Sequence, residues 1–599
     1  MKKICFIAFI VMMLRLGLNA QTVTFSHSGG FYESSFSLEL TCDPAYHIRY
    51  TTNGAAPDAN STLYTGPLYL NEGLYSNSNI YTIPTTIDEL LFTPNSVMKC
   101  IIIRACAFDN NENCVGTVTT QSYFINELGC DTHGLPAMSI AADSSDLFDY
   151  YTGIFVKGVN FDPEHSYWTG NYYMSGDEWE RVVNIEFYET ADNSGVNQTA
   201  GLRTHGGTAR RGPQKGMKLY ARQEYGTKRF YHKFFNDSPK NSVKHLVLKP
   251  FSCQWFSIGI QDWICNSMAR SIGLEYILSR PEALFINGEY WGIYYVSERP
   301  DSHYLEDHFG HSDDDYNVIG SWHGEAEDGQ NVNFIQMMQW LEDADLSDST
   351  NYEHLCSLID VDNFINYYCL ELFIANNDWP ANNMRCYQYL DGKWRWIFFD
   401  GDDCLQKMDF DVFGNATCEQ NLGWPTDAIS TLMFRRLLEN NDFRSAFYTR
   451  FERLLSNQFD YAATNPYLTF AKSLVIDEIP QQAARFNRPK NLSSWINSVN
   501  NIDSFMGDRC DNMRDRINEL FVSLGENQSI TASIFPNPTH GQIHINLTDN
   551  QFTTIKIQVF NLVGTLLYEE YTTTSLAIDM PTGIYLIKIG NSTQRVVVI

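Results

Sequence analysis

The first hundred or so residues after position 20 alternate between apolar and polar side chains in short runs separated by turn residues. Alternation with a period of two is typical of strands with one buried face, and regular strand–turn spacing indicates a small β-sandwich. We therefore predict an all-β domain at residues 21–127, with strands at 22–26, 35–41, 47–52, 68–70, 99–108 and 117–125.

The C-terminal end of the chain shows the same alternation. It predicts a second small all-β domain at residues 531–599, preceded by a linker at 521–530. The strands expected in this domain are 542–547, 554–560 and 565–569, and the stretch 580–589 then leads into 595–599.

Residues 131–520 change from strand-like runs to helical spacing along their length. The predicted strands are 183–188, 215–222, 245–249, 283–286 and 291–296. The predicted helices, several of which begin at N-capping Asp, Asn or Ser, are 262–272, 332–343, 361–375, 427–438 and 442–457. Strands followed by helices indicate a two-lobed α+β core with a cleft between the lobes. The predicted fold class is a multidomain chain in which this core is flanked by two small β-sandwich domains.

Residues 1–20 form a pattern of their own, with Lys2 and Lys3 before an apolar stretch and Ala20 at its end. A basic head, a short apolar core and a small residue at the cut are typical of a secretory signal. A membrane anchor is the alternative, but Arg15 interrupts the stretch, which is too short to span a bilayer. No later stretch of the sequence approaches the ~20 apolar residues of a spanning helix. The sequence thus predicts an exported mature chain without a transmembrane segment.

Composition narrows the class of protein. The 599 residues are too many for one core and indicate three or four domains. Aromatic residues make up 14% of the chain, which is typical of a well-packed globular protein. The net charge of −29 argues against a nucleic-acid partner, because binding phosphates requires a dense surface of Lys and Arg.

The chain has 14 cysteines, of which Cys5 would leave with the signal. No two are spaced as in C-x-x-C, so a zinc ribbon is not indicated. In an oxidising compartment some should form disulfides, and Cys100, Cys106, Cys114 and Cys130 are close enough in sequence to do so. The odd number that remains after export leaves at least one thiol unpaired within the chain.

Asp378 and Asn383 have four residues between them. This is the spacing of the catalytic loop of protein kinases, in which the Asp orients the substrate hydroxyl and the Asn holds a metal. Asp400 follows a run of bulky apolar residues, as does the metal-binding Asp of kinases. Hard oxygen ligands of this kind suit Mg²⁺. The pattern indicates phosphoryl transfer, although Asp and Asn are also frequent turn residues.

Upstream lies a glycine-rich, basic segment at residues 201–220 that runs from Arg203 through Gly206 and Gly207 to Lys215. Glycines allow the backbone to approach phosphates closely, and Arg or Lys neutralises them. The segment is not a Walker A loop, because it lacks the Gly-Lys-Ser/Thr ending. A basic surface hairpin is the alternative interpretation.

Taken together, these segments resemble the spore coat protein H (CotH) family of atypical secreted kinases over about 350 residues. The matching positions are Arg203, Gly206, Gly207, Arg210, Lys215, residues 287–298, Asp362, Asn363, Phe364, Asn377, Asp378, Asn383, Asp400, Gly401 and Asp402. The resemblance implies ATP and Mg²⁺ (or Mn²⁺) as cofactors.

By position, the resemblance implies catalytic roles for Asp378 and Lys215, with Lys218 as the alternative lysine. It assigns the metal to Asn383 and Asp400, and Asp402 would be a second, weaker carboxylate. The implied phosphate and nucleotide pocket consists of Arg203, Gly206, Gly207, Arg210, Lys218 and Glu298. For Glu298, a surface charge at a strand end is the alternative. The run His-Gly-Gly-Thr-Ala at 205–209 departs from the Arg-Gly-Asn-Ser-Ser usual in the family, which puts phosphate binding in question.

The two ends of the chain carry further resemblances. Residues 50–57, Tyr-Thr-Thr-Asn-Gly-Ala-Ala-Pro, resemble the C-terminal β-sandwich of chitobiases and hexosaminidases, an accessory module without chemistry of its own. Phe-Pro-Asn-Pro at 535–538 and Pro-Thr-Gly-Ile-Tyr at 581–585 resemble the type A C-terminal sorting domain of the type IX secretion system. An ordinary immunoglobulin-like appendage is the alternative for this end. The resemblance implies passage through the periplasm to the exterior or the outer cell surface, with the type IX machinery as a partner.

Two functions remain open from the sequence. The first is a secreted or surface-attached kinase that transfers the γ-phosphate of ATP to hydroxyls of a protein substrate with Mg²⁺. The second is a catalytically inactive surface protein that keeps the kinase-like scaffold, since ATP is scarce outside cells. Contact with a surface polysaccharide is compatible with either. The sequence has no Gly-x-Ser-x-Gly and no His-Glu-x-x-His, so serine-hydrolase and zincin chemistry are not indicated.

Overall fold

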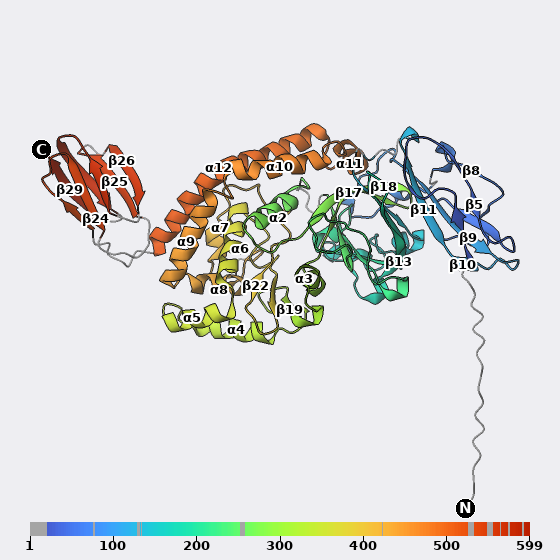
Figure 1. Cartoon of the computed structure of the whole chain (residues 1–599), viewed down its shortest axis with the longest axis horizontal. Coiled ribbons are helices and arrows are strands. Elements are labelled where there is room, and N and C mark those ends of the chain that lie inside the picture. The colour runs from blue at the N-terminus through green and yellow to red at the C-terminus, as the bar shows by residue number, and fades with distance from the viewer. Residues whose placement is uncertain are drawn as a thin grey trace, which may run out of the picture.

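The computed structural model describes residues 21–599 except for 76–77, 129–131, 133, 252–257, 422, 525–531, 548–554, 563–564, 573–574 and 590–591. The predicted signal sequence therefore lies outside the described residues, as does most of the predicted linker. The chain is multidomain and mixes helices with several separate sheets, as the sequence predicts at this level (Figure 1).

The N-terminal part is built around a five-stranded sheet in the order β3-β11-β9-β6-β7. These strands are β3 (Gly30–Tyr32), β11 (Thr119–Ile125), β9 (Ile101–Phe108), β6 (His47–Thr51) and β7 (Thr62–Leu63). Three two-stranded pieces accompany the sheet: β1 (Gln21–Thr22) with β10 (Gly116–Thr117), β2 (Thr24–Phe25) with β5 (Leu40–Thr41), and β4 (Ser37–Leu38) with β8 (Leu68–Tyr69). A disulfide joins Cys106 to Cys114, two of the four cysteines expected to pair. Cys100 is buried, and Cys130 lies outside the described residues.

The next part of the chain closes into a seven-stranded barrel, which the sequence did not predict. In barrel order its strands are β12 (Ala137–Ala141), β13 (Arg181–Tyr188), β14 (Gly195–Thr204), β15 (Met217–Tyr220), β16 (His245–Pro250), β18 (Glu289–Ser297) and β17 (Ser279–Ile286). The parallel pairing of β12 with β17 closes the ring. Buried apolar residues fill it, among them Ile140, Ile185, Leu219, Leu248 and Ile286.

The N-terminal part packs against the barrel through buried carboxylates. Glu186 of β13 accepts hydrogen bonds from the backbone N–H and the hydroxyl of Ser122, at 3.0 and 2.5 Å. Glu289 of β18 accepts from the backbone N–H of Ile80 at 3.0 Å and pairs with Lys99. A buried carboxylate without such donors costs several kcal/mol, so the packing of the two parts is specified by these contacts.

The remainder of the core is mostly helical (Figure 1). Its helices are α2 (Gln261–Ser271), α3 (Ser302–Phe309), α4 (Val332–Asp343), α5 (Ser349–Leu358), α6 (Val361–Ile374), α7 (Val412–Ala416), α8 (Ala428–Leu437), α9 (Asn441–Leu455), α10 (Tyr461–Val475), α11 (Ile479–Phe486) and α12 (Leu492–Leu524). The short helix α1 (Ser144–Phe148) comes between barrel strands β12 and β13 in the sequence. Helix α12 runs to Leu524, so the start of the predicted linker is helical. A four-stranded sheet in the order β20-β19-β21-β22 belongs to this part: β20 (Ala326–Asp328), β19 (Tyr316–Ile319), β21 (Cys386–Tyr389) and β22 (Arg395–Trp396).

Helix α6 lies at the centre of this part, and most of its residues are buried. The Asp360 side chain caps its N-terminus by accepting from the backbone N–H of Asn363 at 3.1 Å. The Asn363 side chain in turn accepts from the N–H of Trp396 at 2.6 Å and donates to its carbonyl at 3.1 Å. These two hydrogen bonds join β22 to α6, so the loops that follow α6 and β22 are held close together.

The C-terminal domain consists of a three-stranded and a four-stranded sheet. Their strands are β23 (Ala532–Phe535), β24 (Gln542–Leu547) and β27 (Leu576–Asp579) in the first, and β26 (Leu566–Thr572), β25 (Ile555–Asn561), β28 (Gly583–Ile589) and β29 (Ser592–Val598) in the second. Alternate residues such as Ile543, Ile545, Ile557, Val559 and Ile587 form its core. The strand alternation seen in the sequence thus corresponds to inward and outward faces.

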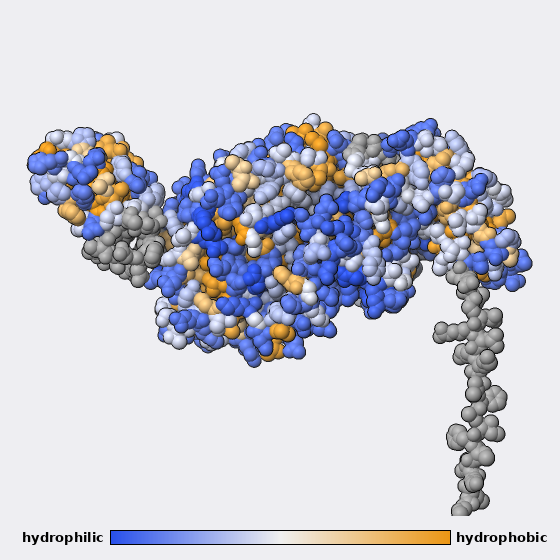
Figure 2. Space-filling model, viewed as in Figure 1, coloured by the Kyte–Doolittle hydropathy of each residue, from blue (hydrophilic) through white to orange (hydrophobic). Residues whose placement is uncertain are grey.

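The surface is mainly hydrophilic over the centre of the face in Figure 2, with hydrophobic residues in small groups. This agrees with the net charge of −29. Within the described residues, none of the helices combines the length and apolar character needed to cross a membrane.

The barrel core gives a first prediction. Ile185→Ala removes a side chain that is fully buried in the barrel, so the free energy of unfolding should fall by about 2–5 kcal/mol. Val182→Ala on the same strand is the matched control, because Val182 is 54% exposed and its change should stay within about 0.5 kcal/mol. Urea unfolding of both variants tests this, and equal losses would contradict the barrel packing.

Candidate active site

The loop after α6 carries Asp378 and is fixed by side-chain contacts. Helix α6 ends at Ile374, and the capping residue Ala375 adopts a left-handed conformation with φ of 52°. Asn376 then donates to the carboxyl group of Glu371 at 2.8 Å and accepts from the backbone N–H of Asp378 at 3.0 Å. Asn377 donates from its side chain to the carbonyl of Asp403 at 3.0 Å. The Asp378 loop is therefore joined to the loop after β22.

The carboxylate of Asp378 lies at the meeting point of the two loops. Its Oδ2 accepts from Asn382 at 3.1 Å and from Asn383 at 3.4 Å. The Asn383 amide also donates to the backbone carbonyl of Asp400 at 3.3 Å. Burial, together with the nearby negative charge of Asp400, raises the pKa of Asp378 to about 6. Asp378, Asn383 and Asp400 thus form one group of neighbouring residues.

A lysine that the sequence analysis did not single out completes this group. Lys249 of β16 donates from Nζ to Oδ1 of Asp400 and to Oδ2 of Asp262, both at 2.8 Å. Asp262 lies in the first turn of α2, and its Oδ1 accepts from the backbone N–H of Gly401 at 2.8 Å. All three ion-pair partners are more than two-thirds buried. The ammonium therefore joins a barrel strand, a helix and the loop after β22.

The oxygen atoms of this group suit a hard divalent cation. Asp378 and Asp400 supply carboxylates, Asn383 supplies an amide oxygen, and Asp402 lies two residues beyond Asp400 in the same loop. Mg²⁺ prefers such ligands and usually keeps several waters. Asp400 itself has a φ of 65°, a strained conformation of the kind that persists where the surroundings fix it. The donor set therefore fits the metal that the sequence analysis expects.

The glycine-rich turn lies between β14 and β15 of the barrel. Gly206 and Gly207 are exposed, and a Cβ added to Gly207 would meet no atom within 4 Å. The guanidinium of Arg203 bonds Glu180 at 2.8 Å and pairs with Asp177. Arg210 lies over the ring of Tyr173 and donates to its carbonyl at 3.1 Å. The turn thus presents open backbone, while its two arginines contact neighbouring protein groups.

Among the described residues, no contact joins Lys215 to Asp378 or Asp400. Its buried ammonium donates to the carbonyls of Thr85, Arg210 and Gly212, at 2.7, 2.8 and 3.2 Å. Burial lowers the pKa of Lys215 well below its ordinary value. The contacts of Lys215 support the glycine-rich turn on its buried side. The ammonium beside Asp400 is that of Lys249.

Comparison with known protein families identifies the chain. Residues 202–513, more than half of the sequence, match the family described as CotH kinase protein, and every residue of the Asp378, Asp400 and Lys249 group lies inside that range. The chain belongs to the CotH kinase protein family.

Both ends of this CotH-family protein also match known families. Residues 533–598 match the family described as secretion system C-terminal sorting domain, which indicates secretion to the exterior or outer surface and a partnership with the type IX machinery. Residues 38–123 match the family described as Fn3 associated. The likeness of this part to the chitobiase module stays a prediction. No curated protein matches the sequence.

Two further residues expected in the nucleotide pocket of this CotH-family protein lie on or directly after barrel strands. Lys218 of β15 pairs in register with Val247 of β16, so by strand alternation it shares a face with Lys249. Burial and the nearby Arg299 lower the pKa of Lys218 to about 8. Glu298 accepts from the backbone N–H of Leu278 at 3.0 Å and pairs with His308 at 2.8 Å, so both carboxylate oxygens have protein partners.

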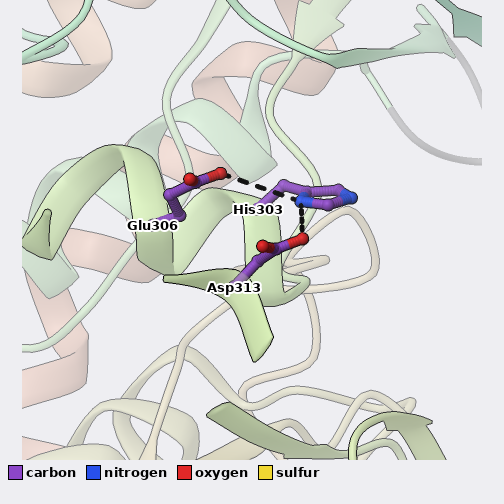
Figure 3. A group of neighbouring side chains, drawn as sticks. All are labelled: His303, Glu306 and Asp313. Atoms are coloured by element: carbon purple, nitrogen blue, oxygen red, sulfur yellow. Dashed lines mark ion pairs between the residues drawn. The ribbon is translucent and has the colours of Figure 1, made fainter. Parts of the chain in front are cut away.

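A separate cluster of titratable residues lies on α3 and the short helix that follows it (Figure 3). The Nδ1 atom of His303 lies 2.8 Å from Oδ2 of Asp313 and 3.9 Å from Oε2 of Glu306. Its three members are partly exposed, and the ion pairs drawn in Figure 3 account for their approach. The cluster shares no member with the Asp378 group.

A pattern available in the sequence could have found Lys249. It is the one Lys or Arg in the otherwise mostly apolar strand β16, and the next helix begins with an acidic residue in its first turn. Protein kinases place their phosphate-binding lysine on such a strand and its acidic partner on the next helix. Lys215 is instead the lysine nearest to the glycine-rich turn in the sequence, which is why it was expected to bind phosphate.

Glu371 beneath the Asp378 loop gives a prediction with a defined pH dependence. Burial raises the pKa of Glu371 from its ordinary value of 4.5 to about 8, and hydrogen bonds from Asn376 and Tyr367 only partly oppose this. Because the folded state holds this proton more tightly than the unfolded state, stability is lost as pH rises from about 4.5 to about 8. Glu371→Gln removes that loss. In urea unfolding, the free energy of unfolding of Glu371→Gln relative to that of the wild type should therefore increase with pH up to about 8 and level off above it. A difference between the two proteins that is constant with pH would contradict this.

Proposed function

We propose that this protein is a secreted or surface-attached kinase that uses Mg²⁺ to transfer the γ-phosphate of ATP to a hydroxyl group of a protein. The observation that carries the proposal is the contact of the Lys249 ammonium with Asp400 and Asp262, each at 2.8 Å. In protein kinases a strand lysine pairs with an acidic residue on the following helix, and activity needs both this ion pair and the contact of the metal-binding Asp with Mg²⁺.

The order of elements supports the same proposal. A turn rich in glycine joins β14 and β15, Lys249 lies on the next strand, and α2 follows with Asp262. Asp378 and Asp400 then come from the helical part of the molecule, after α6 and β22. This is the chain order of the glycine-rich loop, lysine, helix, catalytic Asp and metal-binding Asp in protein kinases. The barrel and the helical part would be the two lobes, with the reaction between them.

Asp378 is the proposed acceptor of the substrate proton. With a pKa of about 6 it is mostly ionised at neutral pH and accepts a hydrogen bond from the attacking hydroxyl. The hydroxyl oxygen forms a bond to the γ-phosphorus, the bond from that phosphorus to the bridging oxygen of ADP breaks, and the proton passes to Asp378. Asn382 and Asn383, which donate to its Oδ2, hold the carboxylate in place.

The charged groups around Asp378 would hold the phosphates. Lys249 is the proposed phosphate-binding lysine, in the role that the resemblance gave to Lys215, and Lys218 lies on the same face of the barrel. Asp400, Asn383 and Asp402 would hold Mg²⁺, which neutralises charge on the transferring phosphoryl group. The exposed backbone of Gly206 and Gly207 would cover the phosphates. Passage through the periplasm and recognition of a protein acceptor belong to the same proposal.

The second candidate is a surface-binding protein without turnover. The arginines of the glycine-rich turn favour it, because Arg203 is paired with Glu180 and Arg210 is engaged with Tyr173. Neither guanidinium is free for phosphate in this arrangement. Contact with a surface polysaccharide, including through the N-terminal part, would be compatible with this candidate.

Labelling with γ-labelled ATP tests the proposal. The purified exported chain is incubated with Mg²⁺ or Mn²⁺ and with a casein-like protein as acceptor, and its own labelling is also measured. Asp378→Asn and Asp400→Asn should each reduce the rate by about 10²–10⁴-fold, since each removes a charge used in the transfer. Asp409→Asn is the control, because this exposed carboxylate follows in the same loop. Label that both site variants retain would refute the proposed roles, and no label from any protein would favour the second candidate.

The choice between the two lysines is tested by nucleotide binding. A ligand that binds only the folded state raises its melting temperature, by an amount equivalent to about 2.7 kcal/mol at one hundred times Kd. Lys249→Met should abolish the rise produced by ATP and Mg²⁺. Lys215→Met should lower the melting temperature without ATP, because three carbonyls lose their donor, but it should keep the rise. The reverse result would return the role to Lys215.

A further inference from the structure

Two buried thiols meet at the junction between α2 and the loop that carries Asp400. Cys265 lies three residues after Asp262 on α2, so the two side chains share a face of the helix. Cys404 lies four residues after Asp400. Both cysteines are completely buried. They therefore flank the residues that hold Lys249.

In the structure both residues are free thiols, and each is close enough to the other to influence it. Nearby, Sγ of Cys265 lies 3.9 Å from the carbonyl oxygen of Gly401. A Cβ atom added to Gly401 would lie only 2.8 Å from Cβ of Cys265. Glycine at this position is what allows the loop to approach α2 so closely.

The chemistry of the chain favours a bond between these thiols. The sorting domain indicates secretion, and disulfides form and persist outside the cytoplasm. Elsewhere in the same chain Cys106 and Cys114 are already joined. Cys369 and Cys510, by contrast, are buried thiols whose surroundings are apolar residues or backbone carbonyls. Cys265 and Cys404 differ from these two cysteines, because each has the thiol of the other as a neighbour.

We propose that Cys265 and Cys404 form a disulfide in the exported protein, which ties α2 to the loop carrying Asp400. In this reaction the two thiols lose two protons and two electrons, and an S–S bond forms between them. A disulfide-bearing oxidant of the thiol–disulfide oxidoreductase class accepts the protons and electrons and is reduced to a dithiol. Because both sulfurs are fully buried in the folded chain, the bond forms during folding and is then shielded from reductants.

The consequence of the bond for activity rests on the proposed function. Asp262 and Asp400 must stay close for Lys249 to bridge them. A covalent link one helical turn from Asp262 and four residues from Asp400 keeps α2 and the loop together when the lobes move. The disulfide form is therefore the more stable form and the more active one.

The first test is a direct chemical measurement on the full chain, purified after export. Free thiols are alkylated under denaturing, non-reducing conditions, and the protein is digested and analysed by mass spectrometry. The proposal expects a peptide pair linked through Cys265 and Cys404, lighter by two hydrogen atoms than the two thiol peptides. Cys106–Cys114 serves as the internal control for oxidation. Alkylation of both Cys265 and Cys404 in protein whose Cys106–Cys114 bond is intact would overturn the proposal.

The second test uses thermal unfolding with and without dithiothreitol. Dithiothreitol reaches the buried bond only when the chain unfolds, and it then reduces the bond in the unfolded state. The melting temperature of the wild type should therefore be lower with dithiothreitol than without it, by on the order of 10 °C for a link that closes so long a loop. The double variant Cys265→Ala/Cys404→Ala should lose most of this response, whereas Cys106→Ala/Cys114→Ala should keep it. Equal responses in the wild type and the first double variant would contradict the cross-link. Neither readout requires ATP, so a failure of the kinase proposal leaves this result interpretable.

Discussion

The ammonium group of Lys249 holds together the parts on which the candidate site depends. It lies between the carboxylates of Asp262 and Asp400, which belong to a helix and to a loop of the helical part, while the lysine belongs to a barrel strand. Without it, two partly buried carboxylates would face each other, which is costly because like charges repel and neither is fully solvated. The barrel fixes the lysine, and the Asn363–Trp396 bonds fix the loop that follows β22.

The two buried carboxylates between the N-terminal part and the barrel have donors directed at them. A chain with a net charge of −29 buries Glu186 and Glu289 only where backbone N–H groups or a lysine point at them. Asp378 is the exception that matters for chemistry, because its amide donors are few and the negative Asp400 is near. Its pKa is raised while Asp400 keeps an ammonium partner, so two aspartates close in space take different roles.

The sequence predicted the elements better than their assembly. The helix expected at 361–375 is observed as Val361–Ile374, and the strand expected at 47–52 as His47–Thr51, because periodicity and caps are local properties. The closed barrel was missed, because the pairing of Ala137 with Ala283 joins distant segments that no short pattern reveals. Asp378, Asn383 and Asp400 were found through spacing, whereas Lys249 meets Asp400 across 151 residues of chain. Lys215 was preferred because it follows the glycines directly.

The burial of Lys215 changes how the N-terminal part should be understood. Its ammonium is bound by the carbonyl of Thr85, and the hydroxyl of the next residue, Thr86, donates to the carbonyl of Arg211 at 2.6 Å. The glycine-rich turn is thus supported from behind by a segment that precedes the barrel. If that support were absent, a buried ammonium and a turn carbonyl would each lose a partner, which is unfavourable in a site shielded from water. The N-terminal part is therefore a structural component of the candidate nucleotide site rather than a separate appendage.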